Sequence, residues 1–189
     1  MKMQRMTSAV ILTYLWVMLI LLGSIILETF MLYPNIFHNP PESLELSMQF
    51  MAVAGPSDFF PPLGFISWVT GVASVILGWR IKSARYWIVG SVLMIVGEGL
   101  ASMALFWPRN TIMFIEGLAV HSPEFLQQTA REFEAMHWLR VGFNVAGSVL
   151  IFVGFLKYYR HLIAAELSPK RVELSNTSVA PAPMESHAL

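Results

Sequence analysis

The residues of this sequence best suited to chemistry are a few ionisable side chains inside long apolar runs. A charged group in such a run is costly and is therefore a candidate for a functional site. Four side chains meet this description: Glu28, Glu98, His137 and Arg140. At about 100° per residue of helix, one narrow arc collects four polar residues: His137, Arg140, Asn144 and Ser148. We expect this polar stripe to face other helices rather than lipid.

One chemistry open to this set is metal binding. The carboxylates of Glu28 and Glu98 and the imidazole of His137 suit a single iron, manganese or copper ion. Asp58 or His38 would add a further ligand. The sequence contains no cysteine, which excludes thiolate metal sites, disulfides and cysteine nucleophiles.

A second chemistry is acid–base work without a cofactor. A carboxylic acid in apolar surroundings can exchange a proton near neutral pH, which makes Glu98 a candidate proton acceptor or donor. Arg140 would then stabilise a developing enolate or phenolate. A structural interpretation stays open as well, in which Arg140 pairs with Glu98 or Glu28 and Asp58 caps a helix.

The composition places these residues in a membrane. Of the 189 residues 56% are hydrophobic and 13% charged, whereas soluble domains have about 25% charged residues. Four runs have the roughly 20 apolar residues that a membrane-spanning helix needs: about 8–30, 61–79, 86–107 and 137–159. The predicted fold is an all-α, integral membrane, antiparallel four-helix bundle. The net charge of zero offers no basic surplus for nucleic acid.

The distribution of basic residues predicts the orientation. Nine of the twelve lie before the first span, between the second and third spans, or near and after the end of the fourth: Lys2, Arg5, Arg80, Lys82, Arg85, Lys157, Arg160, Lys170 and Arg171. The loops at about 31–60 and 108–136 hold only Arg109 and Arg131. The positive-inside rule therefore predicts that both termini are cytoplasmic, in the plasma (inner) membrane.

The segments outside the spans carry helix-start signals at 40–42 (Pro-Pro-Glu) and 122–124 (Ser-Pro-Glu). We predict a short outer helix at about 41–54 that lies on the membrane surface through Leu44, Met48, Phe50 and Met51. The second outer helix, at about 123–136, is expected to continue into the fourth span, to about Arg160. The transmembrane domain would cover 1–165, and 166–189 would be a disordered tail.

Small residues at helical spacing predict where the helices pack. The second span has Ser67, Gly71, Ser74 and Gly78, the third has Gly90, Gly97, Ala101 and Ala104, and the fourth has Gly142 and Ala146. Close approach of the helices at these small residues would bring the polar residues together in the outer half of the bundle. Glu98 lies nine residues before Trp107, about 13 Å below the outer interface. Such convergence is typical of a pocket between helices.

Three short motifs carry a family resemblance. They are Glu-Thr-Phe-Met-Leu-Tyr-Pro at 28–34, Phe-Phe-Pro-Pro-Leu at 59–63, and Pro-Arg-Asn at 108–110 followed by Glu-Ala-Met-His-Trp-Leu-Arg at 134–140. Over about 8–160 the chain resembles the anthrone-oxygenase-like family of small four-helix integral membrane proteins, many of them without a known activity. The resemblance implies oxidation of a lipophilic, electron-rich ring by molecular oxygen, without an evident cofactor. Positions that match the family pattern are Asn110, His137, Trp138 and Arg140.

Two functions follow from these observations. The first is a membrane-embedded oxidoreductase or oxygenase for a small lipophilic aromatic compound. Its catalytic residues would be Glu98, His137 and Arg140, and its substrate-binding residues Glu28, Asn110, Trp138 and Asn144. The alternative is a non-enzymatic accessory or assembly protein, whose second-span stripe would bind a membrane protein partner or another copy of the chain. A transporter is disfavoured because the sequence lacks inverted repeats and broken helices.

Overall fold

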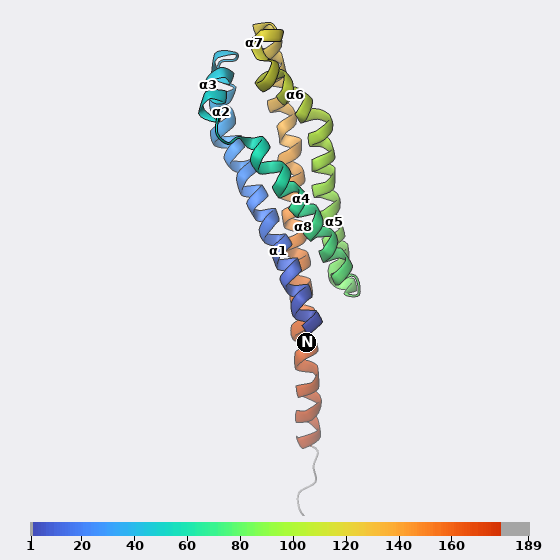
Figure 1. The fold of residues 1–189 in the computed structure, drawn as a ribbon. Helices are drawn as coiled ribbons and strands as arrows, with labels where there is room; N and C mark the ends of the chain where they lie inside the picture. The colour runs from blue at the N-terminus through green and yellow to red at the C-terminus, as the bar shows by residue number, and fades with distance from the viewer. Residues whose placement is uncertain (1, 179–189) are drawn as a thin grey trace, which may run out of the picture.

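The computed structural model describes residues 2–178, and the regular elements in this range are all helices (Figure 1). Four continuous helical runs are long and apolar enough to cross a membrane: Lys2–Ile36, Pro56–Gly78, Lys82–Val120 and Pro123–Ala165. Each overlaps one of the predicted spans. The predicted all-α class is confirmed, with four helices long and apolar enough to cross a membrane.

Two of these runs contain π-helical turns, which the sequence analysis does not predict. The first run comprises α1 (Lys2–Leu27), the π turn η1 (Glu28–Leu32) and α2 (Tyr33–Ile36). The third comprises α5 (Lys82–Ala101), η2 (Ser102–Phe106), α6 (Trp107–Thr111), η3 (Ile112–Glu116) and α7 (Gly117–Val120). The remaining helices are α3 (Glu42–Phe50), α4 (Pro56–Gly78) and α8 (Pro123–Ser178). Such π turns are rare and occur frequently at functional sites.

The long helices lie side by side, with α8 in contact with both α5 and α1 (Figure 1). α4 runs diagonally across the bundle and contacts α1 and α5. Tyr158 of α8 donates a hydrogen bond to the carbonyl of Gln4 on α1 (3.1 Å). At the other end of the same helix pair, His137 lies 2.8 Å from Thr29. The start of α1 therefore lies beside the later part of α8.

Small residues mediate the contact of α4 with its neighbours. The four members of the predicted second-span stripe are the buried residues of α4: Ser67, Gly71, Ser74 and Gly78. A Cβ atom at Gly71 would lie 3.0 Å from Val92 and 3.1 Å from the ring of Tyr14. This stripe is thus used inside the bundle, because only small side chains permit such an approach.

The corresponding stripe on α8 differs from the prediction. Gly142 is exposed and a Cβ there would meet nothing within 4 Å. Gly147 and Gly154 make the close contacts instead, the former against Met18 (2.8 Å) and the latter against Ile88 (3.1 Å). They lie five and twelve residues after Gly142, which places them on the helix face that α1 and α5 cover.

Two apolar clusters lie above and below the polar residues. The inner one comprises side chains of α1, α5 and α8, including Ile11, Tyr14, Met18, Ile88 and Ile151. The outer one comprises Tyr33, Ile36, Phe37, Leu44, Phe106, Met113, Leu126, Ala130 and Phe133. Leu44 of α3 is only 2% exposed and packs into this outer cluster. It therefore does not face the membrane surface as the sequence analysis expects, although Leu46 and Phe50 of α3 are exposed.

The helix bounds differ from the predicted ones in two further places. α4 begins at Pro56, earlier than predicted, so Pro61 and Pro62 lie inside the helix. Asp58 accepts a hydrogen bond from the backbone of Gly55 (2.8 Å), which caps this earlier start. α8 continues to Ser178, whereas 166–189 is predicted to be disordered. Adding a turn to an existing helix needs no new nucleus, and 166–174 is rich in helix-favouring residues. Residues 179–189 of that predicted tail lie outside the described residues.

Candidate functional site

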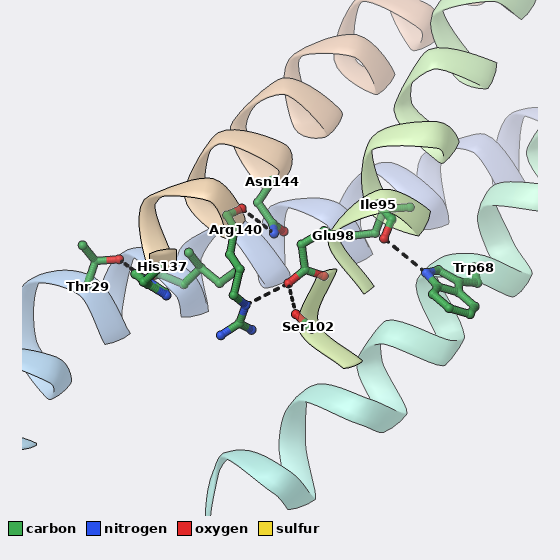
Figure 2. A network of polar contacts seen from close by, with 9 residues as sticks. Thr29, Trp68, Ile95, Glu98, Ser102, His137, Arg140 and Asn144 are labelled. Carbon is green, nitrogen blue, oxygen red and sulfur yellow. Dashed lines mark hydrogen bonds and ion pairs between the residues drawn. The ribbon is translucent and has the colours of Figure 1, made fainter. Parts of the chain in front are cut away.

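A layer of polar side chains separates the two apolar clusters. Four of the sequence-predicted site residues are buried in it: Glu28 on η1, and His137, Arg140 and Asn144 on α8. Glu98 approaches from α5, and its side chain is 12% exposed. Figure 2 shows Thr29, His137, Arg140 and Glu98 following one another from α1 across α8 to α5. Three helices thus contribute to one site.

An ion pair holds the centre of this layer. The Nε of Arg140 donates to Oε1 of Glu98 at 2.9 Å, and the hydroxyl of Ser102 donates to the same oxygen at 2.9 Å (Figure 2). The guanidinium also lies over the rings of Phe60 (5.6 Å) and Phe106 (5.1 Å). Cation–π contacts of this kind partly replace the hydration that a buried guanidinium loses.

The hydrogen bonds of His137 fix its tautomer. Thr29 has one hydroxyl proton, which it donates to the carbonyl of Ile25 at 2.7 Å. The same oxygen lies 2.8 Å from Nε2 of His137, and with its own proton directed to Ile25 it accepts there, which favours the tautomer with the proton on Nε2. The lone pair of the neutral imidazole is then on Nδ1. This atom is buried and has no hydrogen-bond partner among the described residues.

Further unused hydrogen-bonding atoms lie in the same layer. Oε2 of Glu28 and Oδ1 of Asn144 are buried without a partner in the described part of the chain. The ring of Tyr33 packs edge-to-face on His137, with centroids 4.6 Å apart. The Tyr33 hydroxyl lies near both Glu28 and Arg140. Buried polar atoms are rarely left unpaired, so a group of them calls for a functional explanation.

The local backbone explains how these side chains meet. Glu28 and Thr29 are the first residues of η1, and Ser102 is the first residue of η2, four residues after Glu98. A π turn inserts an extra residue into the helical repeat and so rotates the residues that follow it. The turn in the first run thereby sets how Tyr33 lies relative to Glu28, and the turn in the third run does the same for Phe106 relative to Glu98.

Two of the predicted substrate-binding residues do not join this layer. Trp138 is 57% exposed and contacts Phe30 on the outside of the bundle (6.4 Å between ring centroids). It follows His137 directly, so a rotation of about 100° carries it to another helix face. Asn110 lies on α6 and has no hydrogen bond to the layer among those of the described residues. Neither residue is retained in the site.

The candidate metal ligands are not assembled. No three His, Asp or Glu side chains within residues 2–178 are grouped so that they could hold a metal ion. Glu98 is held by Arg140 and Ser102, which directs it away from such a role. Asp58 is the capping residue of α4, and His38 is exposed with its Nδ1 2.9 Å from the carbonyl of Asn35. The residues present therefore do not fit a metal centre.

Five residues that support the site are not among those predicted from the sequence: Thr29, Tyr33, Phe60, Ser102 and Phe106. One signal was available, because Ser102 follows Glu98 by four residues and so lies on its helix face. Phe60 and Phe106 come from different helices, and no spacing in the sequence connects them with Arg140.

A cavity of about 230 Å³ lies outside this layer, between α6 and α8. It is lined by Pro108, Arg109, Ile112, Phe125, Gln128, Thr129 and Glu132, with the Arg109–Glu132 ion pair (3.0 Å) among its residues. None of the lining residues belongs to the polar layer.

The fold and the site together define a class: an all-helical protein with four helices long and apolar enough to cross a membrane, and with a polar layer buried between two apolar clusters. Comparison with known protein families, characterised proteins and solved structures finds no match to this chain.

Proposed function

We propose that the chain is an integral protein of the plasma (inner) membrane, with its four long helices antiparallel and both termini in the cytoplasm. The excess of basic residues at the ends of the chain and in the α4–α5 connection supports this orientation. The absence of native cysteine permits a direct test. A membrane-impermeant maleimide on intact cells should label Ala119→Cys but not Ser83→Cys, and both residues are exposed. The reverse pattern would refute the orientation.

We further propose that the polar layer is the active site of an oxygenase for a small lipophilic aromatic compound with an acidic methylene group. One observation carries this proposal: the free, buried Nδ1 of His137 lies in the same layer as the guanidinium of Arg140. A base and a cation in one dry site are the two elements required to form and stabilise an enolate.

In this mechanism Nδ1 of His137 removes a proton from the methylene carbon, and Arg140 stabilises the negative charge that develops on the conjugated oxygen. The enolate is electron-rich and reduces molecular oxygen directly. One oxygen atom becomes the new ketone oxygen, and the other leaves as water with the two methylene hydrogens. The ring is oxidised, oxygen is reduced, and no further co-reactant is required.

The structure favours a division of roles that differs from the sequence-based expectation. Glu98 is occupied by Arg140 and Ser102, so it serves as a positioning residue that orients the guanidinium rather than as the proton acceptor. His137 takes the role of base. Oε2 of Glu28 and Oδ1 of Asn144 are free to accept hydrogen bonds from hydroxyl groups of the substrate.

The test is oxygen consumption by the purified protein in lipid nanodiscs with anthrone as the substrate, against empty nanodiscs. Loss of a general base costs about 10²–10⁴ in rate, so His137→Gln should lose at least about 100-fold. Trp138→Phe is the matched control, because it alters the adjacent but outward-facing side chain. Oxygen consumption equal to that of empty nanodiscs would refute this substrate, and an active His137→Gln would refute the mechanism.

The alternative of a non-enzymatic accessory protein loses the surface on which it depended. The small-residue stripe of α4 packs against Tyr14 and Val92 inside the bundle and is unavailable to a partner. Leucine would pack in the polar layer at lower cost than an unsatisfied polar set, which supports a catalytic role over a purely structural one.

A further inference from the structure

The guanidinium of Arg140 has more hydrogen-bonding capacity than its neighbours use. Of its five N–H groups, one is bonded to Glu98 at 2.9 Å. The hydroxyl of Tyr33 can accept one more. Among the hydrogen bonds between described residues, none involves the remaining three. A buried guanidinium with unused donors is suited to an anionic oxygen group, which it binds through two parallel hydrogen bonds.

The side of the guanidinium that faces α4 is covered by one aromatic ring. Arg140 extends from α8 to a place between His137 and Glu98 (Figure 2). The ring centroid of Phe60 on α4 lies 5.6 Å from its central carbon. Phe60 is only half-buried, whereas Phe106 in the other cation–π contact is fully buried. Of the two rings that cover the guanidinium, Phe60 is therefore the one nearer to the lipid.

The backbone beside Phe60 is weakly constrained. Pro61 and Pro62 lie inside α4 and have no N–H groups, so two consecutive helical hydrogen bonds of this turn cannot form. The neighbouring side chains on the outer part of α4, Phe59 and Phe65, are 45% and 67% exposed. The first turns of α4 can thus bend with less loss of hydrogen bonding than the rest of the bundle, and their exposed face carries Phe59 and Phe65.

We propose that the site takes amphiphiles that carry one anionic oxygen group on an apolar body, and that they enter sideways from the outer leaflet past Phe60. The anionic oxygen binds the unused N–H groups of Arg140, and the apolar body remains between α4 and its neighbours. This inference rests on the proposed function in that it concerns the same site. It adds the ligand class and the route of entry, and neither requires that oxygen chemistry occurs.

The experiment is photo-crosslinking of the full chain in lipid nanodiscs, with the labelled residues located by mass spectrometry. Four diazirine-bearing probes are compared: a C16 fatty acid, its methyl ester, an alkylated phenol acidified by a ring nitro group, and the methyl ether of that phenol. The two charged probes distinguish a carboxylate from a phenolate ligand, and each neutral probe is matched to one of them. We expect label near Phe60 and on the 137–144 segment from at least one charged probe.

A charge-assisted hydrogen bond contributes enough to change affinity about 10- to 100-fold. Arg140→Gln should therefore weaken labelling by the charged probe by about that factor. On the unmodified chain, the matched neutral probe should label as weakly as the charged probe labels Arg140→Gln. Phe60→Ala should shorten the time to half-maximal labelling, whereas Phe59→Ala, next to it but not over Arg140, should not. Equal labelling by charged and neutral probes would overturn the ligand class.

The route of entry has a separate criterion. Identical labelling rates in Phe60→Ala and Phe59→Ala would overturn it, even if Arg140→Gln failed to fold. Specific labelling without oxygen consumption would remove the oxygenase function and keep this inference. Oxygen consumption together with equal labelling by charged and neutral probes would keep the oxygenase function and remove this inference.

Discussion

The ion pair between Arg140 and Glu98 allows a quantitative test of how dry the polar layer is. The perturbation is a double-mutant cycle of Glu98→Gln, Arg140→Gln and the two together. The side chains of Arg140 and Glu98 are 10% and 12% exposed and meet at 2.9 Å. Removing one partner leaves the other charge buried without its counter-ion, which costs about 3–5 kcal/mol. An exposed pair contributes only about 0.2–1 kcal/mol.

The two single variants are not expected to cost the same. The amide introduced by Glu98→Gln would keep an oxygen that accepts from the Nε of Arg140 and from Ser102. The loss of stability in this variant should therefore lie near the lower end of the range of about 3–5 kcal/mol. Arg140→Gln leaves Glu98 with the hydroxyl of Ser102 alone and removes both cation–π contacts. The double variant leaves no buried charge at this position. It should therefore be more stable than the two single losses predict, with a coupling energy of about 2–3 kcal/mol.

The assay is unfolding of the detergent-purified protein by sodium dodecyl sulfate, followed by far-ultraviolet circular dichroism. Arg109→Gln is the matched control, because Arg109 pairs with Glu132 at a similar distance of 3.0 Å but with side chains 25% and 45% exposed. We expect that control to cost less than about 1 kcal/mol. If Arg140→Gln costs no more than Arg109→Gln, or if the cycle is additive, the inner pair is hydrated and the argument from desolvation is refuted.

Three further predictions concern packing and the limits of the site. Gly71→Ala should destabilise the bundle by about 1–3 kcal/mol through overpacking against the ring of Tyr14. Gly142→Ala, which meets no neighbour, is the control in the same unfolding assay and should gain only the helix propensity of alanine, at most about 1 kcal/mol. Tyr14→Phe should cost about 1 kcal/mol, because it removes the 2.9 Å hydrogen bond to Ser91, and a cost near zero would show that this bond adds no net stability. Trp138→Ala should leave the oxygen-consumption rate of an active preparation unchanged, since the side chain is 57% exposed, and a large loss would return Trp138 to the site.

The sequence was sufficient to predict the four long helices and the polar residues buried between them, but not the helical segments at 33–36 and 107–120. Membrane spans require long apolar runs, and these runs are visible without any alignment. A charged residue inside such a run is costly in contact with lipid, so it is expected to face the interior of the bundle. The arc of His137, Arg140, Asn144 and Ser148 was predictable for the same reason, since the helical period alone places them on one face, and all four are buried.

The parts that failed depend on departures from the ideal helix or on the difference between a motif and a helix face. Three π turns alter the register of the outer segments, and no residue pattern in η1, η2 or η3 distinguishes them from an ordinary helix. Trp138 shares a motif with His137, although its helix face directs it outward. Pro61 and Pro62 resemble a helix start, but the backbone accommodates them inside α4. These features are set by tertiary packing, which one-dimensional spacing does not record.

The distribution of unpaired atoms argues against a layer that exists only for structure. A structural polar network is expected to satisfy its members, because a half-satisfied network is worse than an apolar core. Here Oε1 of Glu98 is bonded by Arg140 and Ser102, and two aromatic rings cover the guanidinium. The free atoms of Glu28, His137 and Asn144 are hydrogen-bond acceptors, and the remaining N–H groups of Arg140 are donors. The complement of this set is a molecule with a hydroxyl or acidic C–H group on one side and an anionic oxygen on the other. Leucines at positions 98 and 140 together would replace the pair at little cost, but they would leave the buried acceptors of Glu28, His137 and Asn144 unexplained.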